Sequence, residues 1–276
     1  MLPEHVAHGC RACTVAARAK AVERVIMMMK ERLTDSLSLQ EMAEIAVSSP
    51  YHFNRVFRHI TGIPPGQFLS ALRLEAAKRL LLTTDLNVID ICFEVGYDSL
   101  GTFTTRFRQL VGLPPTSFRR MAEQLDMAEI FSQFRESMSY SPPAGFGKSD
   151  LKGFITGPED FEGLIFIGTF PLSIPQAQPI SCVLLTAPGE YSLASAPDGQ
   201  YSVLAVALEK NDDSLKALLA EDARRGRAGP LTVRDGGVST QTDISLRKPR
   251  LTDPPITIAL PFLLSQRLDS RHSVSV

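Results

Sequence analysis

The sequence predicts an α + β protein of two domains: an all-α N-terminal domain of short helices joined by one long linker helix, and a mostly-β, sandwich-like C-terminal domain. Three observations predict this division. A pattern of residues recurs at an offset of 50 positions in the N-terminal half. A segment rich in Pro and Gly, residues 141–147, is typical of a linker. Beyond that segment, the hydrophobic residues recur with the period of strands.

The composition is that of a globular protein. The chain has 276 residues, of which 44% are hydrophobic and 21% are charged, so it can bury a core. The net charge is −1, but residues 20–121 hold 13 Lys and Arg against 10 Asp and Glu, a weak local basic excess. Four scattered cysteines favour a reducing compartment. With neither a signal peptide nor a long apolar run, we expect a cytoplasmic protein without a membrane partner.

The repeat predicts two copies of one module, each with two short helices joined by a tight turn. A long helix over residues 65–82 is expected between the copies, where its Leu69, Leu72, Ala76 and Leu80 can pack against both. The matching positions are Ser49 and Ser99, Phe53 and Phe103, Phe57 and Phe107, Arg58 and Arg108, and residues 62–68 and 112–118.

In the first copy, Ser38 and Glu41 form a capping-box pattern that begins a helix. Ser49 followed by Pro50 begins the second helix, as N-cap and first helical residue. Gly62, with a proline two residues later, ends it. Helical spacing predicts two buried stripes, Leu39, Met42, Ile45 and Ala46 in the first helix and Phe53, Val56, Phe57 and Ile60 in the second.

The second copy follows the same plan. Asn87 is the expected N-cap of its first helix, and Ser99 begins its second. Gly96 lies at the turn, where a positive φ costs a glycine little. The predicted apolar positions are Val88, Ile89, Ile91 and Val95 in the first helix and Phe103, Phe107, Leu110 and Val111 in the second.

The buried stripes leave a polar face on the second helix of each copy. Arg can bond a guanine edge with two donors and Asn can pair with adenine, whereas Thr offers a hydroxyl and a methyl group. Helix N-termini attract phosphate oxygens. We therefore expect two tandem helix-turn-helix units that read adjacent major-groove segments roughly 34 Å apart. The candidate DNA-binding residues are Ser38, Ser49, Tyr51, His52, Asn54, Arg55 and Arg58, and then Ser99, Thr102, Thr104, Thr105, Arg106 and Arg108.

Residues 20–121 resemble the AraC-type (AraC/XylS) family of bacterial transcriptional regulators. The resemblance implies the tandem helix-turn-helix fold, double-stranded DNA and RNA polymerase as partners, and control of transcription. Activation and repression both stay open. The motifs that carry it are SPYHFNRVFR at 49–58, GIPP at 62–65, RLEAAKRLL at 73–81, ICFEVGYDS at 91–99 and GLPPTSFR at 112–119.

Two features depart from the family pattern. The second recognition helix begins Leu100-Gly101, where relatives often have polar residues, and Thr105 stands where some relatives have an arginine. We therefore predict that the second unit discriminates less between DNA sequences than the first. The other departure is domain order, because relatives usually carry this domain at the C-terminal end.

The expected domains are an N-terminal extension (1–19), the DNA-binding domain (20–125), a helix and linker (126–158), the β domain (159–266) and a tail (267–276). In the β domain we expect one short helix around Leu215, Leu218 and Leu219. Residues 196–205 are similar to transthyretin-like or carboxypeptidase-regulatory-like sandwiches, which implies a fold and no activity. The expected strands are 164–167, 181–185, 201–208, 238–246 and 256–260, and the basic segments 224–227 and 247–250 are expected to be solvated loops.

The role of the β domain stays open at this point. It can sense a small-molecule effector, dimerise or contact another protein. Alternatively, it is an enzyme or ligand carrier to which DNA binding is secondary, although no catalytic motif is found.

His5, His8, Cys10 and Cys13 can bind zinc, but their spacing is too compressed for a zinc finger, so we expect neither a metal nor a cofactor. Arg73 and Arg79 have two open interpretations, structural ion pairs or phosphate contacts. The oligomeric state is also open.

Overall fold

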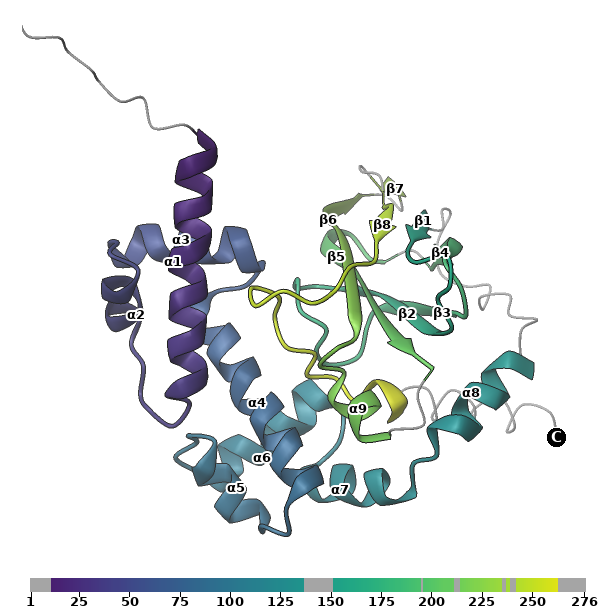
Figure 1. Cartoon of the computed structure of the whole chain (residues 1–276), viewed down its shortest axis with the longest axis horizontal. Coiled ribbons are helices and arrows are strands. Elements are labelled where there is room, and N and C mark those ends of the chain that lie inside the picture. The colour runs from purple at the N-terminus through teal and green to yellow at the C-terminus, as the bar shows by residue number, and fades with distance from the viewer. Residues whose placement is uncertain are drawn as a thin grey trace, which may run out of the picture.

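The computed structural model describes residues 11–136, 151–194, 196–210, 214–234, 237–238 and 242–262. Helices occupy the first half, and the second half holds two sheets and a short helix, so the predicted α + β class is confirmed (Figure 1). No helix in these ranges is long and apolar enough to cross a membrane. The helices are α1 (Arg11–Glu31), α2 (Leu39–Ile45), α3 (Pro50–Thr61), α4 (Pro65–Thr83), α5 (Val88–Glu94), α6 (Leu100–Val111), α7 (Pro115–Gln124), α8 (Met127–Glu136) and α9 (Ser214–Leu219).

The strands form a three-stranded sheet in the order β4-β1-β8 and a five-stranded sheet in the order β3-β2-β5-β6-β7. All pairs are antiparallel except β1 with β8. The strands are β1 (Leu151–Thr156), β2 (Gly163–Phe170), β3 (Ser181–Leu185), β4 (Gly189–Leu193), β5 (Gly199–Glu209), β6 (Arg224–Arg234), β7 (Gly237–Val238) and β8 (Ile244–Ser245).

The first helical cluster joins α1 to α4 around a core of aromatic rings. Phe53 and Phe57 on α3 are buried as predicted, and the ring of Phe57 meets that of Phe68 edge to face. Helix α1 begins at Arg11 and adds Val25 and Ile26 to this core. Leu39, predicted to be buried, is instead 40% exposed because it is the first residue of α2, where the chain has not yet turned toward the core.

The second cluster repeats this plan with α5, α6, α7 and the C-terminal end of α4. Phe103 and Phe107 are fully buried, and Phe107 packs against Phe118 of α7. Ile91 and Val95 are buried as predicted. Ile89 is half exposed, because α5 is only two turns long and places it on the outer side of the helix.

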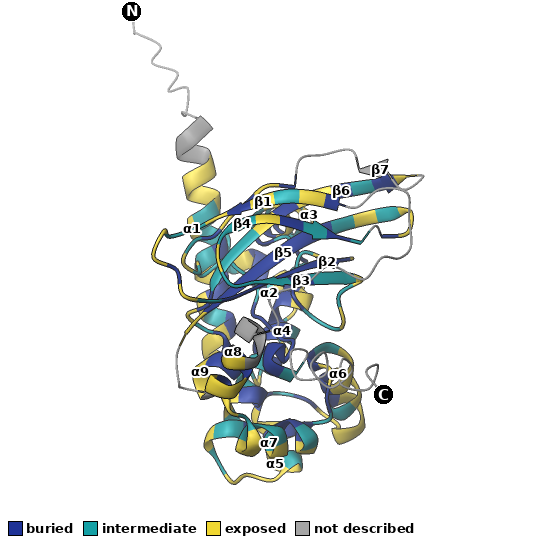
Figure 2. Cartoon of the chain, turned by 90° about the vertical axis from the view of Figure 1, so that its right-hand side faces the viewer, coloured by how far each residue is buried: buried dark blue, intermediate teal, exposed yellow. Residues whose placement is uncertain are grey.

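The two sheets share one hydrophobic core, to which β1, β4 and β8 contribute from one side and β2, β3, β5 and β6 from the other. The five-stranded sheet is also covered on its other face, where Leu204 and Val206 of β5 meet Ile256 and Ile258 from the end of the chain. Strand β2 is therefore almost completely buried, and so is β5 from Ser202 to Leu208, as the dark blue of both strands in Figure 2 shows.

Residues 256–260 were predicted to be a strand, and the structure contradicts this. The segment is irregular and ends in a short helical turn. Its backbone N–H groups bond outside any sheet: Thr257 and Ile258 donate to the carbonyl of Pro175, and Ala259 donates to the carbonyl of Val111 on α6. Its apolar side chains are buried between a sheet and the helices, which explains why the sequence resembles a buried strand.

Other predictions for the C-terminal half also need correction. Residues 224–227 are not a solvated loop, because they begin the long strand β6. Residues 247–250 are a loop with Lys248 and Arg250 exposed, as predicted, but Arg247 is half buried and pairs with Asp253 through two contacts of 2.7 Å. Residues 238–246 hold only β7 and β8 in their described part, and β1 begins at Leu151, inside the segment expected as helix and linker. The short helix α9 is confirmed.

Candidate nucleic-acid interface

Helix α3 is held at both ends by local contacts that the sequence predicts. The hydroxyl of Ser49 accepts a hydrogen bond from the amide of His52 at 3.4 Å, and Pro50 follows as the first helical residue. Gly62 ends the helix in the left-handed conformation, with φ of +88°. These contacts fix where the helix begins and ends, so its rotation about its own axis is set by the buried rings of Phe53 and Phe57.

That rotation leaves a polar face on α3 turned to solvent. Tyr51 is 81% exposed, and Arg55 and Arg58 are exposed as well. His52 and Asn54 are half buried. A guanidinium nitrogen of Arg55 lies 3.3 Å from Nδ1 of His52, a contact that holds both side chains along the same face. The face thus offers two guanidinium groups and an amide, which are the groups that bind base edges and phosphates.

Helix α6 presents a weaker set of groups. Ser99 caps it by accepting from the amide of Thr102, and the Ser99 hydroxyl also donates to the Thr102 hydroxyl at 2.9 Å. The hydroxyl of Thr104 donates to the carbonyl of Leu100 at 2.8 Å. Two of its three threonine hydroxyls are therefore engaged inside the helix. Thr105 is exposed.

Arginines supply the strongest polar groups of α6. Arg108 is exposed, and Arg106 extends toward α4, where it donates to the hydroxyl of Ser70 at 3.4 Å. Ser70 and the exposed Gln67 beside it were not among the predicted site residues. No motif marks them, because only the packing of α4 brings them next to α6.

Ser38, a candidate DNA-binding residue, is already engaged in capping α2. Its hydroxyl accepts from the amide of Glu41, and the Glu41 carboxylate accepts from the amide of Ser38 at 2.8 Å. These two contacts form the predicted capping box. The Ser38 amide is thus already bonded to a carboxylate. The hydrogen bonds that Ser38 gives to this carboxylate lower the pKa of Glu41. A phosphate at this helix end would meet that negative charge.

Arg73 and Arg79, for which the sequence left two interpretations, both make structural contacts on α4. Arg73 donates to the carbonyls of Leu33 and Asp35 at 2.8 Å each, and so ties α4 to the loop after α1. Arg79 pairs with Glu221 at 2.6 Å, across the contact between the helical and the β parts.

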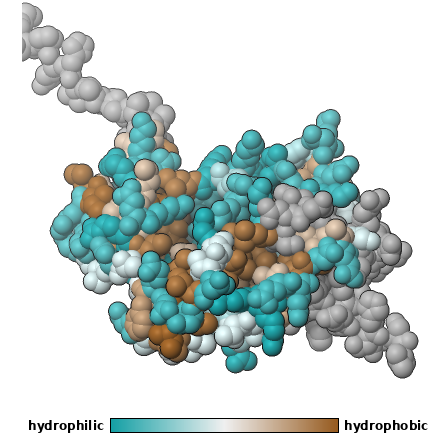
Figure 3. All heavy atoms as spheres, turned by 60° about the horizontal axis from the view of Figure 1, so that its bottom comes forward, coloured by the Kyte–Doolittle hydropathy of each residue, from teal (hydrophilic) through white to brown (hydrophobic). Residues whose placement is uncertain are grey.

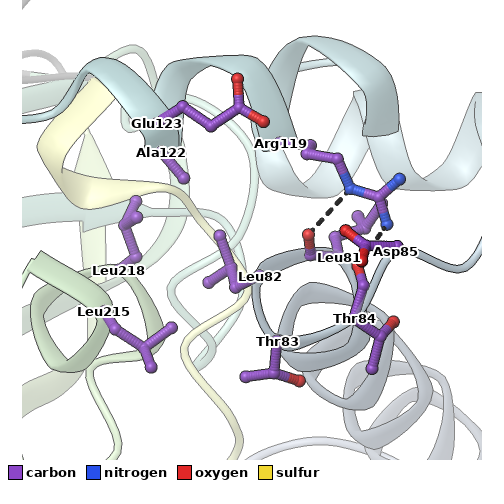
Figure 4. A pocket seen from close by; sticks show the side chains of 10 residues that line it. All are labelled: Leu81, Leu82, Thr83, Thr84, Asp85, Arg119, Ala122, Glu123, Leu215 and Leu218. Atoms are coloured by element: carbon purple, nitrogen blue, oxygen red, sulfur yellow. Dashed lines mark hydrogen bonds between the residues drawn. The ribbon is translucent and has the colours of Figure 1, made fainter.

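Arg119 of α7 holds the C-terminal end of α4 in the same manner. It donates to the carbonyls of Leu81, Thr84 and Leu86 at 2.7 to 3.1 Å. Figure 4 shows this guanidinium at one side of a groove, with Leu82, Leu215 and Leu218 gathered on the other side. The groove has a volume of about 410 Å³ and lies between α4, α7 and α9. The C-terminal half therefore adjoins the second helical cluster directly.

The β part also contacts the middle of α4 through a buried cation. Lys78 is completely buried, and its ammonium donates to the carbonyl of Ile256 at 3.1 Å and lies 6.0 Å from the centre of the Phe118 ring. Burial lowers the pKa of Lys78 from 10.5 to about 8, against the opposing effect of Glu75. Burial in turn raises the pKa of Glu75. No local pattern in the sequence predicts that Lys78 is buried, because its partner Ile256 is 178 residues away.

The rest of the surface offers two further observations. Leu86, Ile89 and Phe93, on and just before α5, are 39%, 50% and 55% exposed. In Figure 3, hydrophobic patches interrupt a mainly hydrophilic surface on the underside of the molecule.

His5, His8, Cys10 and the side chain of Cys13 lie outside the part of the chain that the structure describes, so the predicted absence of a metal there stays a prediction.

The helical half of the chain is similar to known regulators. The family model described as a helix-turn-helix domain matches residues 42–121. Over 102 residues the chain is 32% identical to the HTH-type transcriptional activator AarP of Providencia stuartii, which covers 37% of this chain and 76% of AarP. It is also 32% identical to AdaA of Bacillus subtilis, a bifunctional transcriptional activator and DNA repair enzyme. That match covers 37% of this chain and 48% of AdaA, so the chain spans about half of AdaA.

Solved structures match the same share of the chain. The C-terminal domain of AraT, a response regulator from Geobacillus stearothermophilus, is 31% identical, with 37% of this chain and 84% of that one covered and a TM-score of 0.35. The DNA-binding domain of AdpA, a global transcriptional factor in complex with a target DNA, is 29% identical, with 38% and 94% covered and a TM-score of 0.37. These four matches cover well under half of the chain each.

Proposed function

Because the chain belongs to the AraC-type family of helix-turn-helix DNA-binding transcriptional regulators, we propose that α3 and α6 enter adjacent segments of the major groove of one DNA duplex. The helix pairs α2–α3 and α5–α6 are then the two tandem helix-turn-helix units, and α4 is the helix that links them. The observation that carries this proposal is the division of α3 and α6 into a buried aromatic face and a solvent-exposed polar face.

We further propose that the first unit contributes more to sequence discrimination than the second. On α3, Arg55 and Asn54 stand with Tyr51, His52 and Arg58 on one face. On α6, the hydroxyls of Thr102 and Thr104 are engaged in contacts within the helix or its cap. The Thr104 hydroxyl already donates to a carbonyl and the Thr102 hydroxyl already accepts from Ser99, so each contributes less to a base contact. The guanidinium of Arg55 has several N–H donors, and only one of its nitrogens contacts His52. The exposed arginines of α6 suit phosphate contacts better than base contacts.

Selection of bound fragments from genomic DNA by the full chain tests both statements. Binding to a selected fragment should weaken steeply as salt rises, because contacts to phosphates release counterions. Arg55→Ala should lose about 1–3 kcal/mol of discrimination at one base position. Thr105→Ala, an exposed change on the other recognition helix, should lose less. If Thr105→Ala relaxes base preference as much as Arg55→Ala, the ranking of the two units is wrong.

We propose that the C-terminal part is a sandwich-like regulatory domain that braces the two helix-turn-helix units. Support comes from the core shared by its two sheets and from its contacts with both helical clusters. Ile174 and Leu251 join the core of the first cluster, and Leu218, Ala259 and Phe262 join that of the second. A domain that contacts both units can set the distance and angle between them. Because successive major-groove segments lie at a fixed spacing, this distance and angle affect DNA affinity.

An effector that alters this bracing would alter DNA binding, and RNA polymerase is the proposed partner at the promoter. We also propose that the DNA-binding domain spans residues 20–125, because the residues that α1 supplies to its core, from Val22 to Met29, lie within this range. Removing the C-terminal half and repeating the DNA selection tests the brace. The truncated protein should bind single half-sites and tolerate altered spacing between them. Unchanged spacing preference would refute the bracing role.

A further inference from the structure

A small cavity lies where the β part meets the C-terminal end of α3. Its volume is about 50 Å³. The walls come from β5, β6, the loop after β2 and the segment that follows β8. The polar residues that line it are Ser173, Arg225, Arg227, Arg247 and Asp253. Three of these five side chains are guanidinium groups and only one is a carboxylate.

The carboxylate does not neutralise all three cations. Asp253 bonds Arg247 through both oxygens at 2.7 Å, and it also accepts from the amide of Arg250. Burial lowers the pKa of Arg225, whereas Asp253 and then Glu75 on α4 favour its charged form. Two carboxylates thus face three guanidinium groups. The wall of the cavity therefore has an excess of positive charge at Arg225 and Arg227.

Arg225 also carries a donor without a partner. One of its terminal nitrogens donates to the carbonyl of Pro254 at 2.7 Å. Its Nε is buried and has no hydrogen-bond partner among the residues that the structure describes. A buried donor left unpaired costs about 1–3 kcal/mol, and more when it belongs to a charged group. A guanidinium in this state fits an oxyanion, because its planar fork matches a carboxylate or a phosphate.

The register of the sheet explains why the arginines face the cavity. Arg225 lies opposite Val206 and Arg227 opposite Leu204 in the pairing of β6 with β5. Residues directly opposite each other point to the same face of a sheet. Leu204 and Val206 face the C-terminal segment 256–260 and the helices behind it, so both arginines project toward the helical half.

We propose that this cavity binds a small oxyanion, the carboxylate or phosphate group of an effector, through Arg225 and Arg227. The volume is larger than the roughly 30 Å³ share of one water and far smaller than the roughly 300 Å³ of a site for a drug-sized ligand. The cavity therefore holds a single charged group, and any larger body of the effector extends out of its open side.

The cavity is coupled to the first recognition helix through Gly62, the C-cap of α3. A Cβ placed at Gly62 would lie 2.7 Å from Cβ of Ser173 and 3.0 Å from a terminal nitrogen of Arg227. The wall of the cavity thus touches the end of α3. An anion that draws Arg227 inward changes this contact, and linkage then requires that DNA binding changes anion binding by the same factor. This coupling rests on the proposed function of α3 in reading DNA.

Thermal unfolding of the full chain, followed by circular dichroism, tests the site. Sodium phosphate and sodium acetate are compared with sodium chloride at equal ionic strength. Phosphate, acetate or both should raise the midpoint, and the more effective anion identifies the preferred group. Arg227→Gln should weaken the effect at least tenfold in concentration, because it removes one charge-assisted hydrogen bond. Arg234→Gln, an exposed change at the other end of β6, should leave it unchanged.

Arg225→Gln should weaken the effect more than Arg227→Gln, and Arg227→Gln keeps the test valid if the Arg225 variant does not fold. Equal stabilisation of wild type and Arg227→Gln by every anion overturns the site. DNA affinity is then measured at constant ionic strength with and without the preferred anion. A change of fivefold or more in wild type, absent in Arg227→Gln, is expected. Failure of all sequence-specific DNA binding would overturn the proposed function, whereas the unfolding measurements decide the anion site independently.

Discussion

Lys78 allows a sharp test of how the β part is docked on α4. The ammonium is fully buried and its pKa is lowered from 10.5 to about 8, chiefly by desolvation. Because the folded pKa lies below the unfolded one, the unfolded chain binds more protons between these two values. Stability therefore rises with pH in that window. The cost of keeping Lys78 charged in the folded protein at pH 7 is about 3 kcal/mol.

Lys78→Met keeps the length and the apolar stem of the side chain and removes its charge. The variant also leaves the carbonyl of Ile256 without its donor. That loss is independent of pH, so the size of the stability change at a single pH does not isolate the charge. The pH dependence does. From the two pKa values, the free energy of unfolding of wild type should rise by about 2 kcal/mol relative to that of the variant between pH 7 and pH 9.5.

Urea unfolding at pH 7 and pH 9.5, followed by circular dichroism because the chain has no Trp, measures this difference. Burial raises the pKa of Cys92 and of Tyr191, but both proteins contain these groups, so their effects cancel in the comparison. Lys20→Met, which changes an exposed lysine of α1, is the matched control and should track wild type at both pH values. Parallel behaviour of wild type and Lys78→Met across the range would refute the buried charge at the domain contact.

Three substitutions in the helical half test its local geometry by urea unfolding. Gly96→Ala should destabilise the protein by more than about 2 kcal/mol, because Gly96 has φ of +81° and an added Cβ would lie 2.5 Å from the carbonyl oxygen of Leu33. Gly101→Ala should be neutral or stabilising by up to about 1 kcal/mol, since it lies in α6 with nothing within 4 Å of an added Cβ, and a loss of stability there would contradict the open space seen at this position. Ser38→Ala should cost about 1 kcal/mol by removing the capping box, and a cost no greater than that of Ser48→Ala would contradict its role.

The helical half is the part that the sequence predicts best, because the contacts that define it are local. Each N-cap at Ser38, Ser49, Asn87 and Ser99 bonds an amide three residues later, so a short stretch of sequence contains both partners. The left-handed glycine at position 62 likewise acts on the turn beside it. Helical spacing of the phenylalanines then determines which face is buried, and the remaining face is the candidate DNA-binding surface.

The β half was predicted less well, because strands gain their identity from partners far along the chain. Strand β6 contains four arginines, and in isolation that composition is typical of a surface loop. Its pairing with β5 buries it in a sheet. Residues 256–260 carry the apolar pattern of a strand, but the loop after β2 and helix α6 accept the hydrogen bonds of their backbone N–H groups, and no neighbouring strand in the described ranges pairs with them.

By itself, the sequence determined the helix pairs α2–α3 and α5–α6, their caps and the polar faces of α3 and α6, since the capping partners and the spacing of the buried residues lie within a few helical turns. Only the tertiary structure decided how the β part sits on α4. The contact between Lys78 and Ile256 spans 178 residues, and the cavity at Arg225 and Arg227 combines strands with a distant loop. Such contacts exist only once the chain has closed these long loops, so no short window of sequence contains the groups that must meet.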